Sequence, residues 1–134
     1  MSTAIPVTNL RLFKWLIRIQ ATYILVTAVW PIIDIESFMA ITGPKRDVWL
    51  VKTVGALLIP VACTMYYHLF IRSDHRPVMV LATLTSLAFV VIDFYYALND
   101  VISNVYLLDG IIEGIFLIGW LYLAFSQKNE SQNG

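Results

Sequence analysis

The stretch Pro77–Leu98, PVMVLATLTSLAFVVIDFYYAL, decides the fold, because it holds a single charged side chain, Asp93, in 22 residues. A helix that crosses a bilayer needs about 20 mainly apolar residues. Three further stretches meet this requirement, at about residues 15–33, 48–71 and 106–125. The sequence therefore predicts an all-α integral membrane protein, in which residues 1–134 form one antiparallel bundle of four transmembrane helices.

The composition agrees with a membrane protein and excludes several other classes. Hydrophobic residues make up 59% of the chain and charged residues 13%, whereas a soluble domain carries about a quarter charged residues. Nine Lys and Arg balance nine Asp and Glu, so no basic field attracts nucleic acid. The single cysteine, Cys63, excludes an intramolecular disulfide and a cysteine-rich metal site. Without a glycine-rich nucleotide loop or paired haem histidines, neither a cofactor nor a metal site is predicted.

The distribution of Lys and Arg predicts the orientation in the cell membrane. Four spans place both termini and the middle link on one side of the bilayer, and the first and third links on the other. The first side carries six basic residues: Arg11, Lys14, Arg18, Arg72, Arg76 and Lys128. The second side carries three: Lys45, Arg46 and Lys52. Because cytoplasmic loops are enriched in Lys and Arg, both termini of this multi-pass protein are expected in the cytoplasm, with a frayed polar tail at 126–134.

The link after the first span is too apolar for a solvated loop and too interrupted for a span. Residues 33–41 are expected to form a short interfacial helix, with Asp34 as its N-cap. The pair Gly43-Pro44 then ends this helix.

Ionisable side chains gather in the outer half of the predicted bundle. At 1.5 Å per residue they lie roughly 5–10 Å below the outer ends of their helices. Asp109 and Glu113 share one helix face, since they are four residues apart. Two carboxylates cannot both be charged cheaply there, which favours a proton on at least one, and Lys52 is the natural counter-charge. We expect a polar pocket lined by Lys52, Asp93, Asp109 and Glu113, with Tyr96, Asn99, Asp100 and Tyr106 at its rim.

A structural interpretation of the same acids stays open. Polar side chains near helix ends also hold helices together or reach the interface without binding any ligand. Asp109 in particular lies one turn from water and fits either account.

Small residues predict close helix contacts. Gly110 and Gly114 form a G-x-x-x-G pair on a flank of the fourth span that adjoins the acidic face. Their neighbour is either another helix of the chain or a second copy of it. Gly55 gives the second span a similar contact patch beside Lys52.

Several segments resemble a small bacterial family of four-span membrane proteins. They are Trp30-Pro31, Ser37-Phe38, the run ITGPK at 41–45 with Asp47, the run WLVKTVG at 49–55, and Tyr106-Leu107-Leu108-Asp109 with Glu113. More distantly, four spans with embedded acids are similar to the DoxX-like group and to the sterol-binding EXPERA group. The resemblance covers most of the chain and implies the four-span fold; it implies no activity.

The leading functional hypothesis is a non-enzymatic protein of the lipid bilayer. Its outer pocket would bind a small amphipathic ligand such as a lipid, bind a small cation, or relay protons. One alternative is an accessory subunit whose Gly110 flank docks a second copy or another membrane protein. The other is a small membrane enzyme, such as an isomerase, with Asp93 or Glu113 as acid and base.

Overall fold

The computed structural model describes residues 7–71 and 73–133, so that Arg72 and the last residue of the predicted tail lie outside the described part. Within these two ranges the chain forms helices and no strand. The helices are α1 (Val7–Ile33), α2 (Ile35–Thr42), α3 (Val48–His68), α4 (Arg76–Leu98) and α5 (Val105–Asn133).

Four of these helices, α1, α3, α4 and α5, are long and apolar enough to cross a membrane. This confirms the predicted all-α bundle, with two differences in helix bounds. α1 begins at Val7, eight residues before the predicted span, and α5 continues to Asn133. The prediction of a frayed tail is therefore wrong for residues 126–133. Nothing after Phe125 breaks a helix, and side chains tie the extension down: Asn9 Nδ2 donates to Ser126 Oγ at 2.7 Å.

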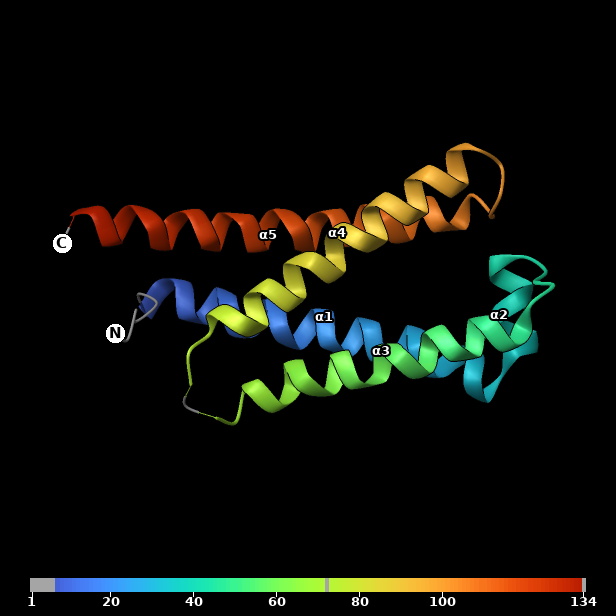
Figure 1. The fold of residues 1–134 in the computed structure, drawn as a ribbon, viewed down its shortest axis with the longest axis horizontal. Helices are drawn as coiled ribbons and strands as arrows, with labels where there is room; N and C mark the ends of the chain where they lie inside the picture. Colours follow the sequence, from blue (N-terminus) through green and yellow to red (C-terminus); the bar gives the residue numbers. More distant parts are fainter. Residues whose placement is uncertain (1–6, 72, 134) are drawn as a thin grey trace.

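The bundle consists of two helical pairs. α1 packs mainly along α3, and α4 mainly along α5, while smaller contacts of α1 with α5 and of α3 with α4 join the pairs. The start of α1, the end of α5 and the link from α3 to α4 lie at one end of the molecule (Figure 1). We call this the terminal end. α2 and the link from α4 to α5 lie at the opposite end, the α2 end.

The apolar core fills the terminal half of the bundle. Its centre is Trp120, which is fully buried and meets Phe13 edge-on at a centroid distance of 5.8 Å. Large apolar side chains elsewhere point outward; Leu57 and Ile118, for example, are 67% and 69% exposed. Such extensive apolar exposure suits contact with lipid. The core is formed by Phe13, Ile17, Ala21, Ile24, Ala62, Met65, Val78, Met79, Ala82, Phe116, Trp120 and Leu123.

α2 confirms the expected short helix in the first link. The Ser37 backbone N–H donates to Asp34 Oδ1 at 3.1 Å, which is the predicted N-cap. Gly43 ends the helix with a φ of 88°, a backbone region open to glycine at little cost. The Trp30 indole donates to Ser37 Oγ at 2.7 Å and fixes α2 against the end of α1.

Candidate functional site

The structure brings the three predicted acids together between α4 and α5. Asp93 and Glu113 are 3% and 1% exposed, and Asp109 is half-buried. Gly110 allows this approach, because a Cβ there would lie 2.9 Å from a Phe94 ring carbon and 3.3 Å from the Asp93 Cβ. Only a residue without a side chain lets α4 come so close to the acidic face of α5.

The carboxyl groups act on one another electrostatically. Asp109 and Glu113 are both neighbours of Asp93 and both influence it. An ionised carboxylate can only accept hydrogen bonds, so two carboxyl groups bond to each other only when one of them carries a proton. We call Asp93, Asp109 and Glu113 the carboxyl cluster.

Tyr23 on α1 completes the cluster, and the sequence analysis missed it. Its hydroxyl donates a hydrogen bond to Asp109 Oδ1, and all three acids act on it electrostatically. A signal was present in the sequence, because Gln20 and Tyr23 are three residues apart in an apolar span and share a helix face.

A buried polar network lies on the side of Glu113 toward the terminal end. Gln20 Nε2 donates to Ser86 Oγ at 2.8 Å and to the Ala82 carbonyl at 3.3 Å, while Trp120 Nε1 donates to Gln20 Oε1 at 2.7 Å. These bonds fix the amide of Gln20. Both N–H donors of Gln20 are thereby engaged, and Gln20 and Ser86 are neighbours of the Glu113 carboxyl.

Two carboxyl oxygens in the carboxyl cluster lack a hydrogen-bond partner in the described part of the chain. Asp93 Oδ2 and Glu113 Oε2 are buried and have no hydrogen-bond partner among the described residues. Buried polar atoms are nearly always partnered, and an exception asks for an explanation such as a proton, an ion or a ligand.

Lys52, the predicted counter-charge, does not pair with the carboxyl cluster in the described part of the chain. Lys52 lies on α3, which packs against α1 rather than α5, and within the described ranges it forms no ion pair with any of the three acids. Gly55, one turn further along α3, does make a close helix contact. A Cβ on Gly55 would overlap the backbone carbonyl oxygen of Ala28 on α1.

The predicted rim residues lie in two different settings. Tyr106 lies near Asp93 and Asp109, and Lys45 Nζ lies 5.0 Å from the centre of its ring. Partial burial lowers the pKa of the Lys45 ammonium. Tyr96 and Asn99, by contrast, are exposed at the end of α4, where Asn99 Nδ2 donates to the Tyr95 carbonyl at 2.6 Å. Asp100, just beyond α4, is also exposed and has a positive φ of 56°.

The two glycines of the G-x-x-x-G pair differ. Gly110 packs against α4 of the same chain, whereas a Cβ on Gly114 would meet nothing within 4 Å. No three His, Cys, Asp or Glu side chains of the described residues form a group that could hold a metal ion.

Comparisons of the chain with family models, with curated proteins and with solved structures gave no match.

Proposed function

We propose that the protein binds and releases a proton at the carboxyl cluster, as a multi-pass protein of a bacterial inner membrane. The observation that carries this proposal is the pair of unpartnered, buried oxygens, Asp93 Oδ2 and Glu113 Oε2. A proton on either group turns an uncompensated charge into a neutral donor, which is the cheapest way to hold a carboxyl in a low-dielectric site.

Proton exchange proceeds from the α2 end. Asp109 is the least buried of the three acids and lies one turn from the start of α5. Toward the terminal end, beyond Gln20 and Ser86, the fully buried Ile17 and Phe13 belong to an apolar core, which offers a proton no carrier. The cluster is thus a dead-end site, which a proton enters and leaves by way of Asp109 and its partner Tyr23.

Infrared difference spectroscopy across a pH titration tests this proposal on the purified full chain. The carbonyl band of protonated carboxyl groups should persist at neutral pH, and Asp93→Asn and Glu113→Gln should each remove part of it. Glu36→Gln is the matched control, since Glu36 is an exposed acid on α2. A neutral-pH spectrum without that band, or a band that neither cluster variant reduces, would refute the proposal.

A small cationic ligand is the second candidate, and it rests on the same two oxygens. Both are acceptors, and within the described ranges no Lys or Arg forms an ion pair with them. Titration with methylammonium at constant pH distinguishes the two functions. Loss of the protonated-carboxyl band with added methylammonium would favour a cation that displaces the proton, and an unchanged band would favour the proton alone.

The orientation proposed with this function puts the terminal end in the cytoplasm. Five described basic residues belong to the terminal side, Arg11, Lys14, Arg18, Arg76 and Lys128, and three to the α2 side, Lys45, Arg46 and Lys52. Reporter fusions at both termini test it. Cytoplasmic reporters should be active at each terminus, and an active periplasmic reporter at the C-terminus would reverse the assignment.

A further inference from the structure

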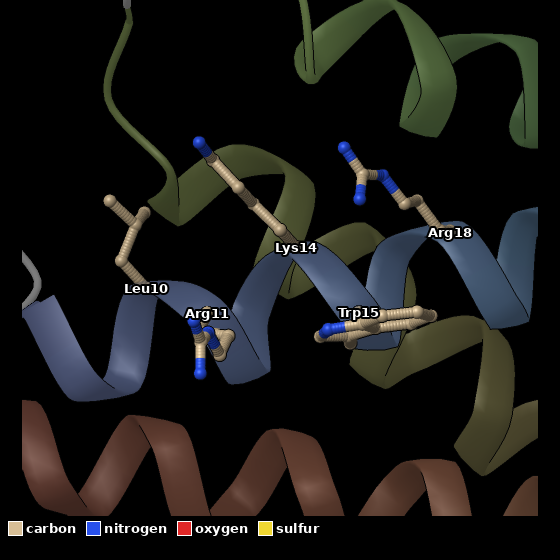
Figure 2. A pocket seen from close by; sticks show the side chains of 5 residues that line it. All are labelled: Leu10, Arg11, Lys14, Trp15 and Arg18. Carbon is tan, nitrogen blue, oxygen red and sulfur yellow. The ribbon is translucent and has the colours of Figure 1, made fainter.

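A second polar feature lies on the outer surface of α1 at the terminal end, far along the helix from the carboxyl cluster. It is a shallow cavity of about 330 Å³. Figure 2 shows its five lining side chains on α1, with Lys14 and Arg18 extending in the same direction and Arg11 extending in another. The lining residues are Leu10, Arg11, Lys14, Trp15 and Arg18. Their spacing of three and four residues places them on one face of the helix.

The cavity carries three positive charges that the protein does not neutralise. Within residues 7–71 and 73–133, Arg11, Lys14 and Arg18 form no ion pair with a carboxylate. Burial mainly, with a contribution from the charge of Lys14, holds the pKa of nearby His75 below its ordinary value, while Asp74 acts in the opposite direction. The three exposed cations that line the cavity can therefore bind an anion.

An apolar strip continues from the cavity along the same helix. Trp15 is 55% exposed, Ile19 is 51% exposed and Val26 is 59% exposed. These residues recur at helical spacing from the cavity to beyond the middle of α1. Indole rings favour the headgroup level of a bilayer, so the cationic cavity lies at the headgroups and the strip lies against the acyl chains.

We propose that this cavity binds one anionic phospholipid, with the phosphate held by Arg11, Lys14 and Arg18 and an acyl chain lying along Trp15, Ile19 and Val26. A guanidinium presents paired N–H donors that match phosphate oxygens, and Lys adds a compact point charge. We assign a lipid rather than a free phosphate ester because the acyl chain of a lipid covers the exposed apolar strip. A soluble phosphate ester would leave that strip uncovered.

Native mass spectrometry of the full chain in neutral detergent tests the proposal. Phosphatidylglycerol and phosphatidylcholine with identical acyl chains are offered in equal amounts. The wild-type protein should retain one phosphatidylglycerol in preference. Each substitution of Arg11, Lys14 or Arg18 by Gln should lower that preference about fivefold, which corresponds to about 1 kcal/mol for a basic residue at an anionic surface.

The control is Arg46→Gln with Arg76→Gln, which removes two exposed cations outside the cavity. It should keep the wild-type preference. Equal retention of both lipids by the wild-type protein, or a triple variant that still prefers phosphatidylglycerol, would overturn the proposal. Circular dichroism checks that the triple variant is folded, and the single variants supply the graded series if it is not.

Soluble glycerol 3-phosphate separates the lipid from its headgroup chemistry. It should raise the thermal stability of the wild-type protein far less than phosphatidylglycerol at the same concentration, and Trp15→Ala should reduce the effect of the lipid. Equal stabilisation by the two compounds would show a site for a phosphate ester, and the lipid assignment would fail.

Discussion

The Tyr23 hydroxyl donates a hydrogen bond to Asp109 Oδ1 and so joins α1 to α5 at the carboxyl cluster. The bond gives Asp109 a donor from α1, while Asp93 and Glu113 each keep one oxygen without a partner among the described residues. The Tyr23 bond therefore distinguishes Asp109 from its two neighbours in the carboxyl cluster.

Tyr23→Phe should destabilise the protein by about 1–3 kcal/mol, the typical cost of leaving a desolvated polar partner unpaired. Tyr66→Phe is the matched control. Its hydroxyl also bonds to α1, at Thr22, but that contact is exposed, so its loss should cost less than about 1 kcal/mol. Reversible unfolding in mixed detergent measures both values. Equal losses of unfolding free energy in the two variants would show that the Tyr23–Asp109 bond stabilises the protein no more than the exposed Tyr66–Thr22 bond does.

Glu113 should be coupled energetically to Gln20 and not to Lys52. Gln20 and Ser86 are neighbours of the Glu113 carboxyl, whereas Lys52 lies on α3 without an ion pair to it among the described residues. In double-mutant cycles, Gln20→Leu with Glu113→Gln should therefore depart from additivity by more than about 0.5 kcal/mol.

The control cycle, Lys52→Met with Glu113→Gln, should add within about 0.5 kcal/mol. Coupling in the control cycle would restore Lys52 as the counter-charge that the sequence suggested. Both cycles are measured by the same unfolding assay.

Hydropathy predicted the four long helices, but it could not predict which helices are neighbours. The apolar residues surround each helix almost evenly, so no single stripe shows which face is buried. Lys52 matched the acids in depth, yet depth does not fix position around the bundle. Tyr23 was overlooked because a tyrosine within an apolar span is unremarkable until α1 is known to adjoin α5.

Two glycine substitutions should differ sharply. Gly55→Ala places a methyl group against the Ala28 carbonyl oxygen, and a backbone atom within a helix cannot move aside cheaply, so a loss of about 1–3 kcal/mol is expected. Gly114→Ala meets nothing within 4 Å and should be neutral or slightly stabilising, since Ala favours helix over Gly. Thermal unfolding in detergent compares them. A large loss for Gly114→Ala would indicate that a second copy or another protein packs on that flank.

The last prediction concerns His75, which lies just before α4 at the terminal end. Its ring Nδ1 lies 2.7 Å from His68 Nε2, and its ring centre lies 4.5 Å from that of Phe13. Burial, assisted by the charge of Lys14, lowers the pKa of His75 below its ordinary value of 6.5, although Asp74 acts in the opposite direction. The folded state therefore favours the neutral imidazole more than the unfolded state does.

Because the pKa of His75 is lower in the folded state, its contribution to stability is present above about pH 6.5 and is lost as the pH falls through the folded-state pKa. The melting temperature of the wild-type protein should thus fall between pH 7 and pH 5. His75→Gln keeps a polar side chain without a titrating ring and should flatten this part of the profile. Asp100→Asn, which changes an exposed acid at the α2 end, should keep the wild-type slope. If His75→Gln also keeps the wild-type slope of melting temperature against pH, the loss of stability in acid arises from groups other than this histidine.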